Sequence, residues 1–273
     1  MSAELFDANY YRRGCGERPY QREPAWLGFF GGVADQLVQR ITPPTVLDAG
    51  CAMGFLVEAL RDRGVAAEGL DISVYAISQV REDIRPYCRV GSVLEPLPRR
   101  YALITCIEVL EHMPASAAEA ALANLCRHTD DILFSSSPRD YAEPTHFNVQ
   151  PPEYWAELFA WNGFTRDVDF DASFLTPWAA RFRRSAEPPA RVVRAYERRF
   201  AQLAQENAEL RAALNALRHA VQVAEQRLAA QTATPAWAVA RTLRAWKTRL
   251  APAGSRRARL LEAVVRATRR RQP

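Results

Sequence analysis

Short apolar stretches alternate with stretches of helical periodicity between residues 45 and 135, and this alternation constrains the fold more than any other feature. The strand-like stretches are residues 45–47, 67–70, 88–90, 101–107 and 132–135. The helix-like stretches between them are residues 55–63, 74–84 and 116–127. Strands that alternate with helices pair in parallel, and the helices cover both faces of the sheet. The sequence therefore predicts an α/β, Rossmann-like, doubly wound and mostly parallel sheet.

The segments that flank this alternation extend the domain. Residues 1–24 are aromatic and polar and predict an irregular arm, and residues 26–41 have helical periodicity. After the last parallel strand, residues 153–161 predict a helix and residues 163–182 predict two antiparallel edge strands. We therefore expect an N-terminal arm and helix in residues 1–40, followed by a sheet domain in residues 41–185.

Beyond a Pro188-Pro189 linker, a long apolar seam predicts a coiled coil in residues 190–230. Its members follow one another at spacings of three and four residues: Val193, Tyr196, Phe200, Leu203, Leu210, Leu214, Leu217, Val221, Ala224 and Leu228. Asn207 falls at an a position of the heptad, where a buried Asn favours a parallel, in-register homodimer. Glu206 and Arg211 are placed to pair across such a dimer. An amphipathic helix that packs on its own domain is the alternative.

The net charge of the chain changes from negative to positive close to this linker. Residues 1–180 hold 15 Lys+Arg and 25 Asp+Glu, whereas residues 181–273 hold 21 and 6, so a net charge of +5 hides an acidic part and a basic part. Residues 235–273 combine eleven basic residues with Trp and Leu. This basic amphipathic tail predicts peripheral contact with an anionic membrane surface. Nucleic-acid binding, which we do not expect, and a solvated tail are the alternatives.

Composition bears on the compartment of the protein. The five cysteines are scattered and contain no C-x-x-C, which argues against a disulfide framework and a zinc site. No apolar run of transmembrane length and no secretory pattern are present. We expect a cytoplasmic protein that can lie peripherally at the inner face of the membrane.

A glycine-rich turn predicts the ligand site. Gly50 and Gly54 lie between the strand that begins at Thr45 and the following helix, and they leave room for a ligand above the end of the strand. Asp71 ends the next strand, 21 residues after Gly50, where its carboxylate can accept both ribose hydroxyls of a nucleoside. The alternative role of Asp71 is to cap the helix that begins near Val74. No phosphate-binding G-x-x-x-x-G-K-[ST] is present.

Four motifs occur in order: Asp48-Ala49-Gly50-Cys51-Ala52-Met53-Gly54, then Asp71, then Gly91-Ser92-Val93-Leu94, and then Glu108-Val109-Leu110-Glu111-His112. Over residues 40–180 they resemble the class I S-adenosylmethionine-dependent methyltransferases. Two positions depart from the family, because Ala52 replaces a common glycine and Ser92 replaces a common aspartate. The resemblance implies an S-adenosyl-L-methionine cofactor and these binding residues: Asp48, Gly50, Cys51, Ala52, Gly54, Asp71, Ile72, Ser92, Val93 and Glu108.

The resemblance narrows further at two other segments. Residues 6–11 and 143–149 look like members of the family that are associated with glycosyltransferase and surface-polysaccharide genes. An amino-methylating (N/D)-P-P-(Y/F/W) signature is absent after the fourth strand, which favours an oxygen or carbon acceptor. The resemblance therefore implies O-methylation of a small-molecule or glycan acceptor, with a sugar or glycan intermediate favoured. A quinone-type or phenol-type O-methyltransferase and a non-catalytic scaffold are the alternatives.

Histidine is the natural general base for a hydroxyl acceptor. His112 follows the fourth strand and His146 lies in the loop after the fifth, so either is a candidate catalytic residue, with His146 favoured. The alternative is that each fixes a loop by hydrogen bonds. Tyr11, Tyr20 and Arg22 of the arm are candidates to close over the cofactor. We expect no metal site.

Overall fold

A computed structural model describes residues 3–13, 18–250, 252, 255 and 257. It divides into two compact units, Met1–Arg199 and Phe200–Pro273. The first unit contains the sheet, and its described strands are β1 (Thr45–Ala49), β2 (Ala66–Asp71), β3 (Cys88–Val90), β4 (Leu103–Ile107), β5 (Asp131–Ser135), β6 (Phe164–Arg166) and β7 (Ala180–Arg184).

The sheet has the predicted mixed topology. In the described chain its strand order is β3-β2-β1-β4-β5-β7-β6, and all neighbours are parallel except for β7, which runs antiparallel to β5 and β6. β6 alone forms the edge on that side. The doubly wound, mostly parallel fold predicted from the alternation of strands and helices is therefore confirmed.

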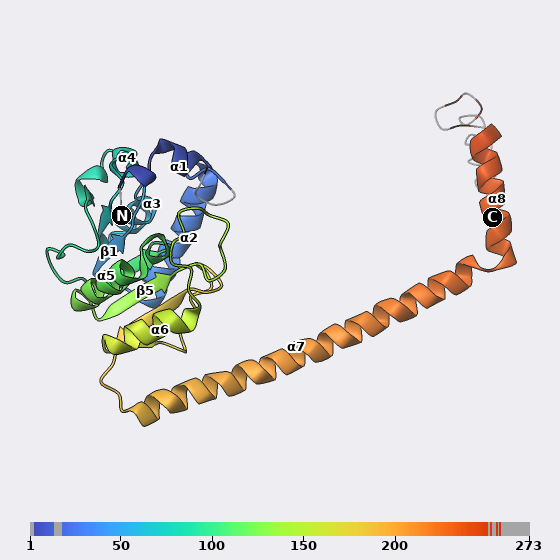
Figure 1. Ribbon diagram of the computed structural model, residues 1–273. Helices are drawn as coiled ribbons and strands as arrows, with labels where there is room; N and C mark the ends of the chain where they lie inside the picture. Colours follow the sequence, from blue (N-terminus) through green and yellow to red (C-terminus); the bar gives the residue numbers. More distant parts are fainter. Residues whose placement is uncertain (1–2, 14–17, 251, 253–254, 256, 258–273) are drawn as a thin grey trace. The chain divides into compact units, whose positions relative to one another are not determined.

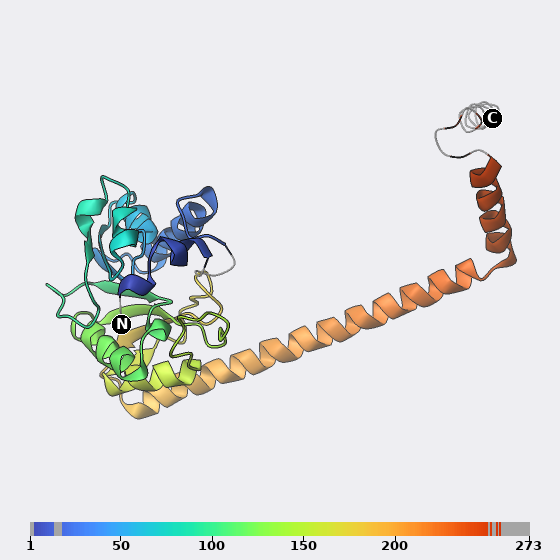
Figure 2. The same cartoon turned by 45° about the horizontal axis from the view of Figure 1, so that its top comes forward.

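Helices cover both faces of the sheet (Figures 1 and 2). The helices of the first unit are α1 (Ala8–Arg13), α2 (Pro24–Arg40), α3 (Phe55–Arg61), α4 (Val74–Ser78), α5 (Ala115–Arg127) and α6 (Pro152–Trp161). Successive strand residues point to opposite faces, so Val46 packs with α2 and α3 whereas Leu47 packs with α5 and α6. Two apolar cores result, one on each face.

Two expectations about local structure were wrong. Residues 1–24 are not wholly irregular, because Asp7 accepts hydrogen bonds from the backbone N–H groups of Asn9 and Tyr10 and starts α1. The helix predicted over residues 74–84 ends at Ser78. Val80 and Ile84 are buried, as their apolar character suggested, but they lie in turns that lead to Pro86.

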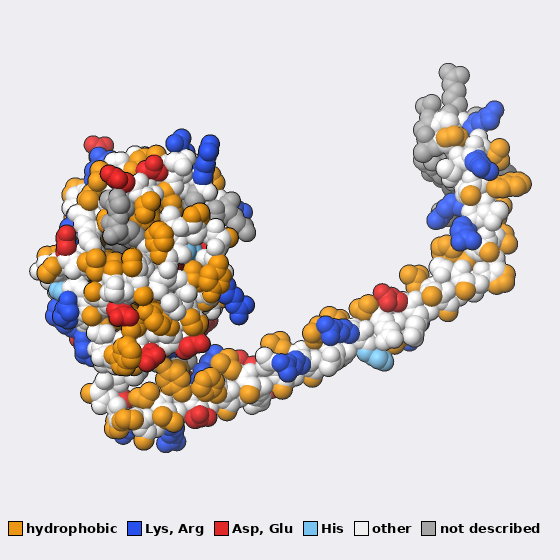
Figure 3. Space-filling model, viewed as in Figure 1, with side chains coloured by type: hydrophobic (Ala, Val, Ile, Leu, Met, Phe, Trp, Pro, Cys, Tyr) orange, Lys and Arg blue, Asp and Glu red, His pale blue; other side chains and the backbone are white. Residues whose placement is uncertain are grey.

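Two helices follow the sheet. α7 (Pro189–Thr232) is one uninterrupted helix with no buried residue, and α8 (Pro235–Leu250) begins after a break at the predicted position. Figure 3 shows hydrophobic side chains at the surface along α7 and several Lys and Arg side chains on α8. The later part of the predicted tail, including Leu260, Leu261, Val264 and Val265, lies outside the described residues. Among the helices that the structure describes, none has the length and apolar character needed to span a membrane.

The packing of α6 on the sheet generates a stability prediction. Phe159 stacks on Phe182 of β7 with ring centroids 3.9 Å apart and is 1% exposed, whereas Trp161 on the same helix is 73% exposed. We expect Phe159→Ala to lower the free energy of unfolding by about 3–5 kcal/mol, because it leaves a cavity in the core. Trp161→Ala should change it by no more than about 0.5 kcal/mol. Urea unfolding of both variants measures the difference, and equal effects would contradict this packing.

Candidate functional site

The candidate site lies at the carboxyl ends of the parallel strands. The strand order reverses between β1 and β4, and ligands of doubly wound sheets bind in the crevice at such a switch point. The glycine-rich turn follows β1, Asp71 ends β2, Glu108 follows β4 and Ser135 ends β5. The fold therefore brings together the motifs that the sequence placed far apart.

The turn after β1 adopts a conformation that needs its glycines. Gly50 has a φ of +87°, and a Cβ there would lie 2.2 Å from Cγ2 of Val109 in the segment after β4. Gly54 has a φ of +70° and precedes the first turn of α3. Ala52 also has a positive φ, of +46°. It therefore adopts the left-handed conformation that glycine reaches more easily because glycine has no Cβ. The turn is thus held close to the β4 segment.

Asp71 ties this turn to β2. Its Oδ2 accepts a hydrogen bond of 2.8 Å from the N–H of Ala52, and its Oδ1 accepts one of 2.7 Å from the N–H of Ser73. Burial raises the pKa of Asp71, and the two backbone donors partly offset this. The helix-capping alternative was wrong, because Ser73 caps α4 through its own hydroxyl. Each oxygen of Asp71 keeps a lone pair for a further donor.

The remaining predicted cofactor residues lie around this turn in different roles. The thiol of Cys51 is buried, and it approaches Gly69 so closely that a Cβ there would lie 2.6 Å from Sγ. Ile72 packs against the core, and Val93 is buried. Ser92 is half-buried, and its hydroxyl accepts a hydrogen bond from the N–H of Leu94. The Cys51 side chain is therefore packed against Gly69 of β2.

Asp48 lies inside the sheet beneath the turn. Its Oδ1 accepts a hydrogen bond of 2.7 Å from the hydroxyl of Thr105 in β4. Burial raises the pKa of Asp48 to about 7, and the negative charge of Asp71 acts in the same direction. A carboxyl group that is neutral through much of the acidic range is thus built into β1.

Carboxyl groups also crowd the segment after β4. Glu108 has a φ of +53°, and its Oε1 accepts a hydrogen bond of 2.9 Å from Nε1 of Trp178. Glu111 is fully buried, and its Oε1 accepts a hydrogen bond from the N–H of Ser137. Burial raises the pKa of Glu111 well above its usual value, and the nearby Glu108 raises it further.

Both predicted histidines lie in one buried cluster. The His112 and His146 rings are 4.6 Å apart between centroids, although their residues come from different loops. Nδ1 of His112 lies 3.1 Å from Oγ1 and 3.2 Å from the carbonyl oxygen of Thr145. The Thr145 hydroxyl gives its hydrogen to Oε1 of Glu143, at 2.6 Å, so Nδ1 of His112 must be the donor. Nε2 of His112 therefore carries the lone pair.

The pKa of His112 supports the assignment of the lone pair to its Nε2. Burial lowers the pKa of His112 to about 4, and the neighbouring His146 lowers it as well, so its ring is neutral near pH 7. Nδ1 of His146 donates to the carbonyl oxygen of Asp140 at 2.9 Å, and its Nε2 lies 3.3 Å from Oε2 of Glu143. The structure brings both candidate bases together and gives His112 the available lone pair.

The N-terminal arm closes over this cluster. The Phe6 ring meets the His112 ring edge-on, with centroids 5.5 Å apart, and the Phe6 carbonyl accepts a hydrogen bond of 2.5 Å from the hydroxyl of Ser73. The Tyr10 hydroxyl donates to Oε1 of Glu143 at 3.1 Å. The arm therefore joins the Asp71 end of the site to the histidine cluster.

The arm residues singled out from the sequence have other partners. Arg22 makes two hydrogen bonds to Glu58 of α3, and Tyr11 and Tyr20 are buried in the core. The contacts of Tyr10, Glu143, Thr145 and Trp178 with the site residues were missed. The sequence predicts His146 and Tyr11 as candidates within residues 143–149 and 6–11, but one sequence cannot show that these two distant segments are in contact.

The residues present fit a nucleoside-bearing ligand such as S-adenosylmethionine. Among the described residues, three buried polar atoms at or beyond the end of β5 have no hydrogen-bond partner: Ser135 Oγ, Ser136 Oγ and Asn148 Nδ2. Such atoms are rare in folded proteins because each costs about 1–3 kcal/mol. Together with the spare lone pairs of Asp71, they indicate a polar ligand.

Comparison with known proteins agrees with this geometry. A family model described as a methyltransferase domain matches residues 30–168, which is half of the chain. The chain therefore belongs to the methyltransferase domain family.

Individual relatives and structures agree with the family. The chain is 33% identical over 132 residues to the ubiquinone biosynthesis O-methyltransferase of Neisseria meningitidis serogroup C, a match that covers 43% of this chain and 53% of the relative. It is 29% identical over 120 residues to the enzyme of that name from Nitrosomonas europaea, covering 39% of this chain and 51% of that one. The chain thus spans about half the length of these curated relatives.

The fold is similar to that of magnesium protoporphyrin IX methyltransferase from Synechocystis PCC 6803, whose structure holds S-adenosylmethionine. The TM-score is 0.52 at 19% identity, and the match covers 67% of this chain and 95% of that one. Its complex with S-adenosylhomocysteine gives a TM-score of 0.53 at 20% identity, covering 67% and 98%.

The buried Asp48 generates a pH prediction. Because its pKa is raised from 3.8 to about 7 on folding, its contribution to stability is complete below about pH 4 and is lost as the pH rises to 7. Asp48→Asn keeps an acceptor for Thr105 and removes the titration. We expect the wild type to lose about 4 kcal/mol relative to this variant between pH 4 and pH 8, at 1.36 kcal/mol per pKa unit. Urea unfolding at several pH values tests this, and a pH-independent difference would contradict it.

Proposed function

We propose that this chain is an S-adenosylmethionine-dependent methyltransferase that methylates a hydroxyl oxygen of a small molecule. One observation carries the proposal: the residues suited to bind a nucleoside and the residues suited to accept a proton are joined in one site. Asp71 and the glycine-rich turn form a nucleoside half, and His112 with His146 forms a proton-accepting half. Phe6 contacts both, through the Ser73 hydroxyl and through the His112 ring.

The chain's residues divide the chemical work. Bound S-adenosylmethionine would supply a methyl group made reactive by its positively charged sulfur. Asp71 would accept hydrogen bonds from the ribose hydroxyls, and the Gly50 turn would leave space for the ligand beside Val109. The histidine cluster would promote loss of the acceptor's hydroxyl proton, with the Nε2 lone pair of His112 directly available. Phe6 and Tyr10 would exclude water from that step.

The comparisons bear on which acceptor is proposed. Similarity to ubiquinone O-methyltransferases supports the phenol-type acceptor that the sequence left as an alternative. No comparison supports the sugar or glycan intermediate favoured from the sequence, so we propose a phenol-type acceptor. The intact Gly50, Gly54 and Asp71 argue against the non-catalytic scaffold.

Two variants separate the half-sites. Asp71→Ala should weaken S-adenosylmethionine binding about 10- to 150-fold, because hydrogen bonds to a charged group are worth about 1.5–3 kcal/mol. His112→Ala should leave that affinity unchanged and lower kcat about 10²- to 10⁴-fold with a phenolic acceptor. Calorimetry and transfer of a labelled methyl group give the two readouts. Absence of cofactor binding by the wild type would refute the proposal, and the exposed Asp83→Asn serves as the control for Asp71.

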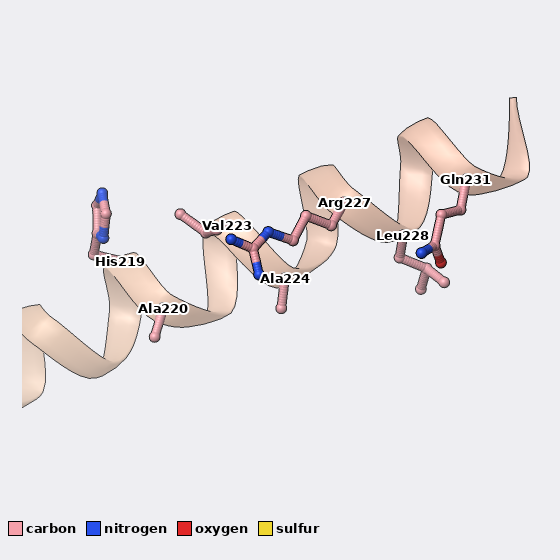
Figure 4. A pocket seen from close by; sticks show the side chains of 7 residues that line it. All are labelled: His219, Ala220, Val223, Ala224, Arg227, Leu228 and Gln231. Carbon is pink, nitrogen blue, oxygen red and sulfur yellow. The ribbon is translucent and has the colours of Figure 1, made fainter.

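We also propose that α7 forms a parallel coiled-coil homodimer. Its apolar seam is exposed on the single helix; Leu210, for example, is 71% exposed. A long helix with an exposed seam gains most of its stability by packing that seam on a partner. Figure 4 shows this helix between His219 and Gln231, where Ala224 and Leu228 belong to the seam. A second copy is the occupant favoured by Asn207 at an a position and by the opposite charges of Glu206 and Arg211.

The dimer is tested by the mass of the chain in solution. Sedimentation equilibrium should give a dimer for the wild type and a monomer for the double variant Leu210→Asp/Leu217→Asp. In a dimer of this variant, one Asp from each chain would be buried at each of the two d positions. Ala212→Asp, at an outward f position of the same heptad, should remain dimeric. A monomeric wild type would exclude the coiled coil.

We propose that α8 lies on an anionic membrane surface. Val239, Leu243, Trp246 and Leu250 recur at helical spacing and are exposed, whereas Arg241 and Arg244 lie on the opposite side of the helical wheel. Basic amphipathic helices of this kind lie in the interface with the apolar face inward.

Vesicle binding tests the membrane proposal. Leu243→Glu should weaken co-sedimentation with phosphatidylserine-containing vesicles about 10- to 100-fold, because it removes one leucine's burial of about 1.5–3 kcal/mol. Thr248→Glu adds the same charge on the opposite face and should weaken binding less. Equal binding of the wild type to neutral phosphatidylcholine vesicles would argue against the electrostatic contribution of Arg241 and Arg244.

A further inference from the structure

Three ligand-type side chains converge beneath the N-terminal arm. His112, Glu143 and His146 each offer one nitrogen or oxygen atom, and these atoms all lie within 4.8 Å of one another. His112 is buried, and the side chains of His146 and Glu143 are only 5% and 11% exposed. Water solvates carboxylates that gather at a surface, whereas buried polar groups are costly unless they bind a partner. The burial of this cluster therefore favours a bound ligand.

Among the residues that the structure describes, the hydrogen-bond network leaves one ligand-type atom of each of the three side chains without another partner. Nδ1 of His112 donates to Thr145 and Nδ1 of His146 donates to the carbonyl oxygen of Asp140, so in each ring Nε2 is the nitrogen left to bind a cation. Oε2 of Glu143 lies 3.3 Å from Nε2 of His146. Two acceptors at that distance repel unless a proton or a cation lies between them.

The other oxygen of Glu143 is already used. Its Oε1 accepts the hydroxyl hydrogens of Thr145 and Tyr10, at 2.6 Å and 3.1 Å, which leaves Oε2 for the shared space. Histidine ligands of metals commonly donate their second ring N–H to a carbonyl or carboxylate, and this outer shell fixes the tautomer. Both histidines here already have that support.

We propose that His112, Glu143 and His146 bind one divalent transition-metal ion. Two imidazoles and one carboxylate form the ligand set of catalytic zinc sites and of non-heme iron sites, which keep open positions for water or substrate. Bond lengths of about 2.0–2.2 Å place neighbouring ligand atoms about 3.3 Å apart in tetrahedral geometry, which the Glu143–His146 pair already satisfies. The ligand atom of His112 lies within 4.8 Å of the other two and would have to move closer to complete the set.

The ion gives the histidine cluster a defined chemical role. This chemical role rests on the proposed function, whereas the binding of the ion does not. A hydroxyl group that binds the ion at an open position would do so as its anion and release its proton to the solvent on binding, because a bound cation lowers the pKa of its oxygen ligand. The Nε2 lone pair of His112 would then hold the ion and would not itself take the proton. The Asp71 half-site takes no part in holding the ion.

Cobalt is a suitable probe because its bound form absorbs visible light and zinc does not. The tag-free chain should bind one Co²⁺ per chain with a visible absorption band, and Zn²⁺ should displace it. His112→Ala and the isosteric Glu143→Gln should each weaken Co²⁺ binding more than about 100-fold, beyond the effect of losing an outer-shell partner. His219→Gln, on the exposed surface of α7, is the matched control and should bind as the wild type does.

The support from Thr145 offers a finer test. Thr145→Val removes the hydroxyl that orients His112 and Glu143 and should weaken Co²⁺ binding about 10- to 100-fold, and Thr145→Ser should restore it. The proposal is overturned if the wild type binds no Co²⁺, or if Glu143→Gln and His112→Ala bind it as tightly as the wild type. Calorimetry with S-adenosylmethionine is run on the same samples, so that failure of the cofactor site is recorded separately from failure of the ion site.

Discussion

The carboxylate of Asp71 is the link on which the rest of the site depends. It receives the N–H of Ala52 from the turn after β1 and the N–H of Ser73 from the start of α4. Ser73 in turn donates its hydroxyl to the Phe6 carbonyl, so the same link positions the N-terminal arm. A buried carboxylate without such donors would cost several kcal/mol, and its two bonds therefore fix the turn, α4 and the arm together.

The parts of the site that follow strands could be predicted from the sequence. Gly50, Asp71 and Glu108 lie next to strand ends, and parallel strands bring their carboxyl ends to one edge of a sheet. The mostly parallel pairing could be predicted because alternation with helices leaves few arrangements, whereas the order of the strands came from the structure. The shortened α4 was missed for a local reason, since Val80 and Ile84 are buried in turns that have the same apolar spacing as a helix.

The histidine cluster could be predicted only as two separate candidates. His112 follows a strand, but His146 lies in the long loop between β5 and α6, whose path is set by contacts such as that of the Asn148 N–H with the Glu111 carbonyl. Tyr10 reaches Glu143 from the other end of the domain. No periodicity or spacing encodes these contacts, because they depend on how two irregular segments fill the space above the sheet.

The division of charge along the chain is consistent with a site that holds buried carboxyl groups. The acidic unit buries Asp48, Asp71 and Glu111 at one edge of its sheet, where burial raises the pKa of each carboxyl group. Carboxyl groups that are costly to ionise in the apo site become favourable once a positive charge lies near them. S-adenosylmethionine brings a sulfonium and a divalent ion brings two charges, so a site rich in buried acids is suited to cationic ligands. The excess of basic over acidic residues, which would oppose such ligands, lies after residue 180, where the chain holds 21 Lys+Arg and 6 Asp+Glu.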